Sequence, residues 1–322
     1  MDRLDRLLID ELQNDFPLAA RPFSELGRRL DETEEEALRR TRRLAKSGVL
    51  LRIAALFSPV VVGWSSTLVG IRVEPGLEAR LACEAAEIPW VTHLYERDDE
   101  WRLWAALVAP SLDAIRETLA RLSGAPGVAA VAELPAVRTY KVRATFPVSV
   151  ERKPRREGRP SRVCGDDARM LAGLSAGLCL VEEPFAEAAA RLGVSQEELL
   201  ARLAALRQTG ALRRVGAVVE GSRLGLAHGA LAALRVAGAI DEAGLALACL
   251  PGVTHCYRRR PHALFPFELF AMVHAASDDE LAALAGTIEA TAGEAVSVEK
   301  LRFMRTARRW VRRPPAYGGA FG

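Results

Sequence analysis

A seven-residue pattern occurs twice in this chain, and it contains residue types that exchange protons and bind carboxylates. Residues 91–97 have the sequence VTHLYER, and residues 253–259, which begin 162 positions later, have VTHCYRR. The chain has five His and four Tyr, and two of each lie in these copies. Packing alone would explain a repeated Val and Thr. A repeated His, Tyr and Arg at the same spacing favours a site of chemistry.

Side chains two residues apart in a β-strand point to the same face. His93 and Tyr95 therefore project together, and so do His255 and Tyr257. A histidine can give or take a proton near neutral pH, and a tyrosine hydroxyl can support it with a hydrogen bond. One copy alone would equally fit a packed interface histidine. Two copies favour a binding or catalytic site.

Basic residues follow each His–Tyr pair. Arg97 ends the first copy, and Arg258 and Arg259 end the second. Guanidinium groups bind carboxylates in a bidentate manner, so the ligand is expected to be anionic. His274 lies on the following strand of the second half, near the equivalent of the apolar Val108 in the first half. The spacing of the histidines matches no zinc motif, so no metal site is expected.

Three helices and a strand are predicted before each copy. The expected helices span residues 4–16, 24–30 and 34–46 in the first half and 167–178, 181–191 and 196–208 in the second. Apolar residues recur at helical spacing, and Thr33 with Glu36 forms a capping-box pattern at the start of the third helix. A strand over residues 49–53 follows. This order is typical of a winged helix-turn-helix.

The pattern then changes to that of a mixed sheet. In the first half we expect strands over 66–73, 90–96, 101–108 and 128–133, helices over 75–87 and 111–122, and a further edge strand over 140–146. The order β-α-β-β-α-β is that of a ferredoxin-like domain, and it recurs over residues 229–301. The fold class is therefore α+β, a tandem duplication of a winged helix-turn-helix plus a ferredoxin-like domain.

Composition shifts set the expected domain boundaries. The expected parts are a winged helix-turn-helix (1–62), a ferredoxin-like domain (63–147), a basic linker (148–163), a second winged helix-turn-helix (164–224) and a second ferredoxin-like domain with a basic C-terminal tail (225–322). The linker is expected to be solvated. The basic run over 300–313 fits a solvated tail or a positive surface for a polyanion, and both alternatives stay open.

The composition excludes several protein classes. The N-terminal residues contain acids throughout, unlike a signal peptide, and no run of about 18 uncharged apolar residues could span a bilayer. The five Cys never form C-x-x-C, so neither a disulfide framework nor a zinc cage is expected. The protein is expected to be soluble and cytoplasmic. A net charge of +3 gives no general case for nucleic-acid binding.

The arrangement of domains resembles that of Lrp/AsnC transcription regulators in both halves, so DNA binding is the alternative function. The predicted recognition helices argue against it. Residues 31–36 (DETEEE) and 195–198 (SQEE) place acids at the helix N-termini, where a reader of the major groove needs basic or amide side chains. Further along the first of these helices are four arginines, which could touch phosphate or pair with glutamates three or four positions before them: Arg39, Arg40, Arg42 and Arg43.

Within the Lrp/AsnC-like proteins the chain resembles the siroheme decarboxylases of heme d1 and alternative heme biosynthesis. The similar segments are LLRIAALFSPVVVGWSSTLVGIRV and WVTHLYER in the first half, and LRRVGAVVEGSRLG, GVTHCYRRR and FPFELFAMVH in the second. That family has two paralogous subunits, and this chain looks like both fused, as in the NirD–NirL type. The resemblance implies a carbon–carbon lyase of denitrification that removes carbon dioxide from two acetate side chains of siroheme, giving didecarboxysiroheme.

The resemblance also implies roles for particular residues. His255 would donate a proton or orient a carboxylate with support from Tyr257, and His93 and Tyr95 would be the matching first-half pair. The implied substrate-binding residues are Arg258, Arg259, Arg97, His274, Phe267 and Trp101. The chain has FPFE at 265–268 where the family's second subunit has W-P-Y-N, so it lacks a tyrosine hydroxyl and has an acid in place of an amide.

The partners follow from the same resemblance. No cofactor is expected beyond siroheme, which brings its own iron. Siroheme and its decarboxylated products, a second copy of the chain and other heme d1 biosynthesis proteins are the candidate partners, whereas DNA and membranes are not expected. Which half holds the working site, or whether both do, stays open.

Overall fold

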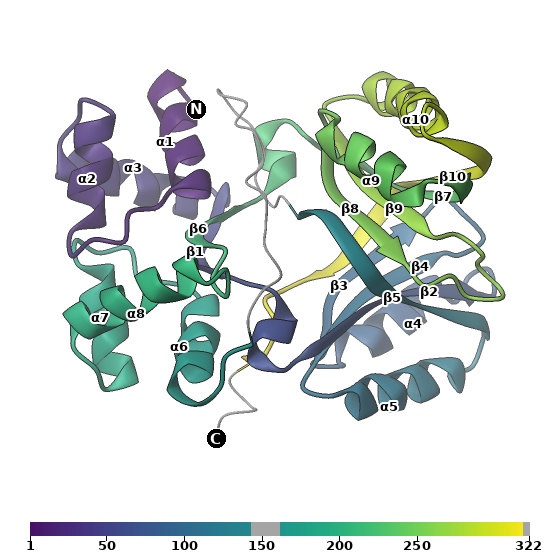
Figure 1. Ribbon diagram of the computed structural model, residues 1–322, viewed down its shortest axis with the longest axis horizontal. Helices are drawn as coiled ribbons and strands as arrows, with labels where there is room; N and C mark the ends of the chain where they lie inside the picture. The colour runs from purple at the N-terminus through teal and green to yellow at the C-terminus, as the bar shows by residue number, and fades with distance from the viewer. Residues whose placement is uncertain (143–161, 318–322) are drawn as a thin grey trace. The chain divides into compact units, whose positions relative to one another are not determined.

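The computed structural model describes residues 1–142 and 162–317. The chain forms two compact units, and each half of the sequence contributes to both. Among the described residues, the helical unit contains 1–63, 162–224 and Tyr317, and the barrel unit contains 64–142 and 225–316 (Figure 1). The expected linker at 148–163 lies outside the described residues except for its last two positions. Like domains of the two halves are therefore joined to each other.

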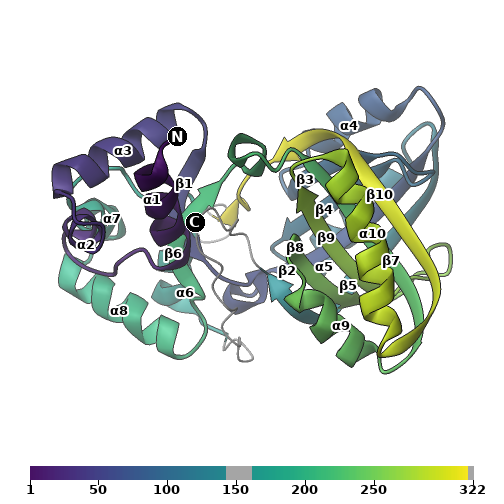
Figure 2. The same ribbon diagram turned by 90° about the horizontal axis from the view of Figure 1, so that it is seen from above.

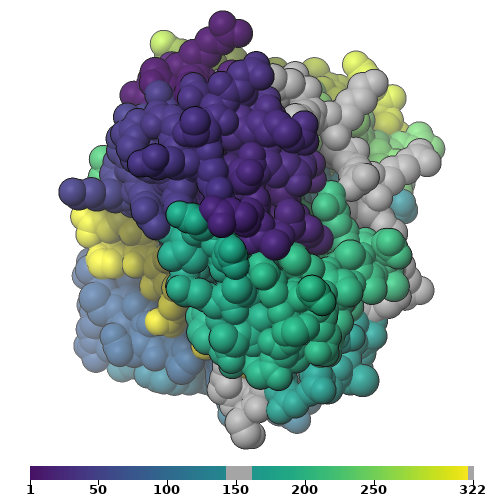
Figure 3. All heavy atoms as spheres, turned by 90° about the vertical axis from the view of Figure 1, so that its left-hand side faces the viewer, coloured from purple at the N-terminus to yellow at the C-terminus, as the bar shows by residue number. Residues whose placement is uncertain are grey.

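The helical unit contains both predicted helix-turn-helix motifs. Its elements are α1 (Arg3–Asn14), α2 (Pro22–Arg29), α3 (Glu34–Lys46), β1 (Leu50–Leu56), the short helix η1 (Pro59–Val62), α6 (Gly165–Ser175), α7 (Pro184–Leu192), α8 (Gln196–Gln208), β6 (Arg214–Val219) and the short helix η2 (Gly221–Leu224). Strands β1 and β6 pair antiparallel, with Ile53 opposite Ala217. In Figure 3, first-half segments in purple and second-half segments in teal form one continuous surface on this unit.

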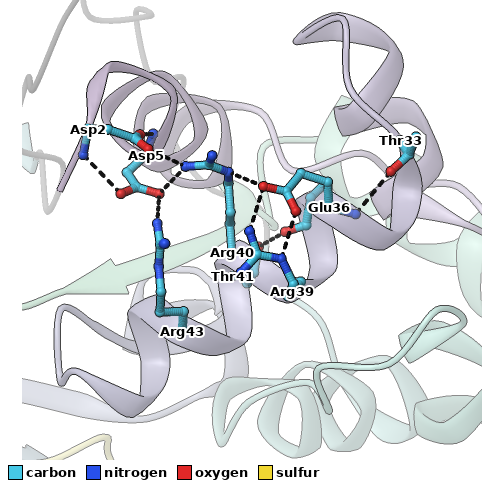
Figure 4. A network of polar contacts seen from close by, with 9 residues as sticks. Asp2, Asp5, Thr33, Glu36, Arg39, Arg40, Thr41 and Arg43 are labelled. Carbon is cyan, nitrogen blue, oxygen red and sulfur yellow. Dashed lines mark hydrogen bonds and ion pairs between the residues drawn. The ribbon is translucent and has the colours of Figure 1, made fainter.

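The predicted start of α3 is confirmed, but its capping box is only half formed. The Thr33 hydroxyl accepts a hydrogen bond from the Glu36 backbone N–H at 3.2 Å. The Glu36 carboxylate does not return to the cap, because it accepts from Arg39 at 2.6 and 2.7 Å and from Arg40 at 2.6 Å (Figure 4). The Glu36 carboxylate thus binds two arginine side chains instead of the Thr33 backbone N–H that a capping box would give it.

Glu36 should make the stability of the helical unit depend on acid pH. Hydrogen bonds from Arg39 and then Arg40 lower the pKa of Glu36 from 4.5 to about 2. The contribution of the ionised Glu36 to the free energy of folding is therefore full above pH 4.5. It is lost as the pH falls through the folded-state pKa of this carboxyl group. We expect Glu36→Gln to flatten the fall of the thermal midpoint between about pH 4.5 and 2, in melts followed by circular dichroism. Glu35→Gln, outside the network of Figure 4, is the matched control; an equal flattening there would contradict the assignment.

The barrel unit contains the two predicted ferredoxin-like runs, and the α+β fold class is confirmed. Its elements are β2 (Ser65–Val73), α4 (Glu78–Ala86), β3 (Val91–Arg97), β4 (Leu103–Ala109), α5 (Leu112–Ser123), β5 (Val128–Val142), β7 (His228–Gly238), α9 (Ile240–Cys249), β8 (Val253–Arg259), β9 (Leu269–Ala275), α10 (Asp278–Gly293) and β10 (Val296–Arg312). The strands form one closed barrel in the order β10-β3-β4-β2-β5-β8-β9-β7. Helices α9 and α10 cover the outer face of the second-half strands (Figure 2).

Two strands are longer than predicted, and they close the barrel. β5 pairs with β2 and then continues along β8, and β10 pairs with β7 and then continues along β3. The predicted edge strand at 140–146 is thus wrong for its described part, which is the end of β5, while 143–146 lie outside the described residues. The basic C-terminal run is a strand as far as Arg312 and not a solvated tail. Closure pairs the backbone groups that β3 and β8 would otherwise expose as sheet edges.

Side chains on the inner face of the barrel form a separate aromatic core. Trp101, Trp104, Phe265, Phe267 and Phe270 are each at most 3% exposed there. The ring centroid of Phe265 lies 5.4 Å from that of Trp101, 5.2 Å from that of Trp104 and 4.6 Å from that of Phe267. The outer faces of the two half-sheets pack in two further cores against α4 and α5, and against α9 and α10.

Packing between β5 and α9 holds the two halves of the barrel together. The Tyr140 hydroxyl donates to Asp241, which Arg138 also pairs with. A Cβ added at Gly244 would overlap the Tyr140 ring. We expect Gly244→Ala to destabilise the protein by about 1–3 kcal/mol, measured as a lower urea midpoint, because the ring must move. Gly286→Ala in α10, where a Cβ meets nothing within 4 Å, should stabilise by up to about 1 kcal/mol. Equal effects of the two substitutions would contradict this packing.

Candidate functional site

The repeated His–Tyr pairs lie on β3 and β8, and each pair projects from one face as predicted. The ring centroids of His93 and Tyr95 are 6.3 Å apart, and those of His255 and Tyr257 are 6.2 Å apart. The interplanar angle is 19° in both pairs. All four side chains are partly exposed. The duplication therefore reproduces side-chain geometry as well as sequence.

A threonine hydroxyl determines which nitrogen of each histidine carries a proton. The Thr92 hydroxyl donates to the Ala106 carbonyl at 3.0 Å and lies 3.1 Å from His93 Nδ1. Its single proton is used for the carbonyl, so it must accept from His93, and Nδ1 carries the hydrogen. Nε2 is then the nitrogen that exchanges protons with a ligand.

The second half repeats this arrangement. Thr254 donates to the Met272 carbonyl at 3.2 Å, and its hydroxyl lies 3.1 Å from His255 Nδ1. Sequence reasoning missed both threonines, because strict strand alternation puts Thr and His on opposite faces. A β-bulge between Val253 and His255, and its counterpart in β3, lets adjacent side chains meet. The repeated Thr before each His was the available signal.

Arg97 and Arg259 end the two copies. Arg97 is buried and Arg259 is partly buried, and the Nε atom of each is inaccessible to solvent. Arg97 donates to the Met304 carbonyl at 3.1 Å and to the Thr306 hydroxyl at 3.0 Å. Arg259 donates to the Leu134 carbonyl at 2.7 Å. Burial lowers the pKa of each arginine to about 10. In the part of the chain that the structure describes, the Nε of each lacks a hydrogen-bond partner.

A tyrosine ring lies beside each of these two arginines. The guanidinium carbon of Arg97 is 5.4 Å from the Tyr95 ring centroid, and that of Arg259 is 4.7 Å from the Tyr257 centroid. An aromatic face partly compensates a cation for lost hydration. Each copy is therefore a His–Tyr–Arg row along one strand face.

The structure places Arg258 away from this row. Its side chain pairs with Asp241 of α9 at 3.7 Å, on the outer face of β8. Strand alternation requires this, since Tyr257 and Arg259 face inward. The counterpart of Arg258 in β3 is Glu96, so Arg259 and not Arg258 repeats Arg97.

His274 lies close to the second pair. Its Nδ1 is 3.4 Å from the Thr254 hydroxyl that also contacts His255. His274 pairs with Gly229 on β7, as Val108 pairs with Ser66 on β2. The register therefore makes His274 the counterpart of Val108, and the second half gathers two histidines around one threonine.

Trp101 and Phe267 were predicted to bind substrate, and the structure places both in the inner aromatic core. They are 1% and 3% exposed. Glu268, which occupies the amide position of the resembling family, accepts a hydrogen bond from the Val236 backbone N–H at 3.1 Å, and burial raises its pKa. These three side chains support the barrel, and any contact with a ligand stays a prediction.

We also searched the described residues for a cavity, a metal site and a membrane-spanning helix. A surface cavity of about 370 Å³ is lined by Leu119, Ser123, Val131, Glu133, Pro135, Arg260, Pro261 and His262, none of them from the His–Tyr–Arg rows. Over residues 1–142 and 162–317, no group of three or more His, Cys, Asp or Glu side chains could hold a metal ion. Of the helices described, none is long and apolar enough to cross a membrane.

The arginines of the predicted recognition helix α3 are engaged within the protein. Arg40 pairs with Asp2 and Asp5 as well as Glu36, and Arg43 donates to Asp5 (Figure 4). Arg42 donates to the Leu180 carbonyl at 2.9 Å. Phosphate binding by these residues would have to break intramolecular bonds, to acids for Arg40 and Arg43 and to a backbone carbonyl for Arg42, which disfavours the regulator alternative.

Comparison with known proteins finds related families and relatives over most of the chain. The model of the AsnC-like ligand binding domain matches residues 61–141 and 223–309, and that of the siroheme decarboxylase NirDL-like HTH domain matches 5–50 and 167–213. The siroheme decarboxylase NirDL subunit of Paracoccus denitrificans is 37% identical over 285 residues, 87% of each chain. The NirG subunit of siroheme decarboxylase from Pseudomonas aeruginosa is 36% identical over its full length, which covers 46% of this chain.

A solved structure agrees over nearly the full length. The crystal structure of the siroheme decarboxylase NirDL in complex with an iron-uroporphyrin III analogue is similar with a TM-score of 0.72 and 27% identity, covering 99% of this chain and 96% of that one. A half-length relative and a full-length relative together fit the predicted fusion of two paralogous subunits. The duplicated fold, the paired His–Tyr–Arg rows and these similarities agree, and the chain belongs to the siroheme decarboxylase NirDL family.

Proposed function

We propose that this chain is a siroheme decarboxylase that converts siroheme to didecarboxysiroheme by releasing carbon dioxide from two acetate side chains. The observation that carries the proposal is the duplicated His–Tyr–Arg row, with each histidine held in one tautomer by a threonine. Relatives over most of the chain are named siroheme decarboxylases. A proton donor beside buried cations suits an anionic substrate that must gain a proton where it loses carbon dioxide.

The reaction needs an electron sink for the electron pair of the carbon–carbon bond that breaks when carbon dioxide leaves. Protonation of a pyrrole carbon next to the acetate makes the ring an electron sink, and the carbon–carbon bond to the carboxylate then breaks. Carbon dioxide leaves, a proton adds to the former methylene carbon to give a methyl group, and the ring loses the proton that it gained. His255 Nε2 is assigned as the proton donor with Tyr257 in support, and His93 and Tyr95 are the matching pair. No separate cofactor enters this sequence.

Arginines supply the complementary charge. Arg259 and Arg97 are assigned to substrate carboxylates, because each is a cation whose buried Nε lacks a partner among the described residues. His274 is assigned to orient the second-half ligand through Thr254. The proposal keeps the five domain boundaries that were expected from the sequence. It also includes a cytoplasmic location, assembly of the chain into a homo-oligomer, and contacts with other heme d1 biosynthesis proteins.

The test is anaerobic incubation of the purified protein with siroheme, followed by mass spectrometry of the tetrapyrrole. Stepwise loss of two carbon dioxide units is the expected result. Siroheme that binds with unchanged mass would make the protein a carrier and overturn the proposal. Absence of both binding and mass change would bring back the DNA-binding alternative, which predicts a salt-dependent shift of duplex DNA.

A further inference from the structure

The strand beside the first His–Tyr pair contributes two arginines to it. In the pairing of β10 with β3, Arg309 is opposite Tyr95 and Arg312 is opposite His93. Directly opposed residues of antiparallel strands place their side chains on the same face of the sheet, about 5 Å apart at Cβ. Arg309 is exposed and Arg312 is partly buried. The first-half row is thus bordered by two further cations.

The neighbours of these arginines confirm which face they occupy. Val311 packs into the outer core of the first half. Arg308 lies over the Trp310 ring, 4.9 Å from its centroid, and Trp310 belongs to the same outer core. With these side chains directed outward, Arg309, which follows Arg308, and Arg312, which follows Val311, are on the inner face with His93 and Tyr95.

The end of β10 is held firmly in this register. Arg313 donates its backbone N–H to the Thr92 carbonyl at 2.8 Å and its Nε to the Val91 carbonyl at 2.8 Å. Its Nη2 also donates to the Ala86 carbonyl at 3.0 Å. These bonds fix the backbone next to Arg312, so the position of that side chain is built into the fold.

The second half differs at the corresponding positions. In the pairing of β5 with β8, Thr139 is opposite Tyr257 and Val142 is opposite His255. The two pairings follow the same pattern of bulges, so the comparison is position by position. Here the neighbouring strand adds a hydroxyl and an apolar group, and the extra polar group is His274 from β9. The first row therefore has two additional arginines beside it, and the second row has one additional histidine.

We propose that Arg309 and Arg312 bind carboxylates of the tetrapyrrole substrate, which makes the corner between β3 and β10 an anion-binding site of the barrel. This inference rests on the proposed function. A tetrapyrrole with several acetate and propionate groups presents carboxylates along its rim, and planar guanidinium groups pair with them in a bidentate manner. The partly buried position of Arg312 strengthens such a pair, because water screens it less than at an open surface. Arg309 and Arg312 are positioning residues and take no part in proton transfer.

The test compares Arg309→Gln, Arg312→Gln and the double variant with the wild type. Siroheme affinity is measured by absorbance titration at two salt concentrations, and KM and kcat by the mass-spectrometric assay. We expect the dissociation constant and KM to rise about tenfold for each substitution, with a smaller change in kcat and a weaker salt dependence of binding. Arg308→Gln, a neighbouring charge on the outer face, and Thr139→Ala, the second-half counterpart, should bind siroheme within about twofold of the wild type.

Unchanged affinity in the double variant would overturn the inference. So would an equal loss in Arg308→Gln, which would indicate net charge alone, or in Thr139→Ala, which would show that the loss does not depend on the cations of β10. These outcomes are distinguishable from failure of the proposed function. A wild type that binds siroheme without changing its mass refutes the decarboxylase, and the titrations still decide whether Arg309 and Arg312 hold the ligand.

Discussion

His255→Ala is expected to lower the rate of siroheme decarboxylation by about 10²–10⁴-fold, which is the usual contribution of a positioned proton donor. The histidine is held through Nδ1 by Thr254, so Nε2 is the nitrogen that gives the proton when the ring is doubly protonated. Alanine removes the donor and leaves the barrel strands paired. The measurement is the single-turnover rate of carbon dioxide loss with enzyme in excess, which separates chemistry from product release. Siroheme affinity should change little.

His93→Ala is the matched variant for this prediction, because the two histidines share strand position, tautomer and exposure. We expect its main effect on siroheme affinity, since His93 is next to the arginines of β10. A large loss of rate in His93→Ala with none in His255→Ala would reverse the assignment of the proton donor. Arrest after a single decarboxylation in one variant would show that each half processes one acetate.

The secondary structure could be predicted well because its signals are local. The third helix of each helix-turn-helix was predicted with its observed bounds, since Thr33 and Ser195 cap helices whose apolar faces recur at helical spacing. The order of strands and helices in the ferredoxin-like runs followed from alternation and turn residues. Helix ends without side-chain caps, such as that of α4 at Leu77, were placed a few residues away.

Long-range pairing could not be predicted from the same signals. No sequence pattern within residues 136–142 or 306–312 identifies the strand with which each segment pairs. Their basic and polar side chains fit an edge strand or a solvated tail equally well. They pair because β3 and β8 would otherwise leave backbone groups unpaired, and this requirement belongs to the whole barrel. The roles of Arg309 and Arg312 depend on that pairing, so the sequence offered no means of finding them. The His–Tyr–Arg rows, by contrast, depend only on alternation within one strand.

The position of Arg97 is costly for stability, which indicates a functional reason for it. Its side chain is 2% exposed, and burial lowers its pKa from 12.5 to about 10. The folded state therefore holds this proton less tightly than the unfolded state. The cost is full at all pH values below about 10 and is relieved only as the pH rises above that value. The shift corresponds to a destabilisation on the order of 3 kcal/mol at neutral pH.

Arg97→Met is accordingly expected to keep or raise the thermal midpoint at pH 7 while weakening siroheme binding at least about tenfold. Methionine keeps a long apolar side chain against the inner core and removes the buried charge, and such replacements are often neutral or stabilising. It gives up the bonds to the Met304 carbonyl and the Thr306 hydroxyl, which offset part of the gain. Calorimetry with and without siroheme measures both effects. Arg308→Met, on the outer face of β10, should change neither. Collapse of the fold in Arg97→Met would make Arg97 a structural residue, whereas a stable variant that has lost its ligand shows that the barrel bears a buried cation in order to hold a substrate carboxylate.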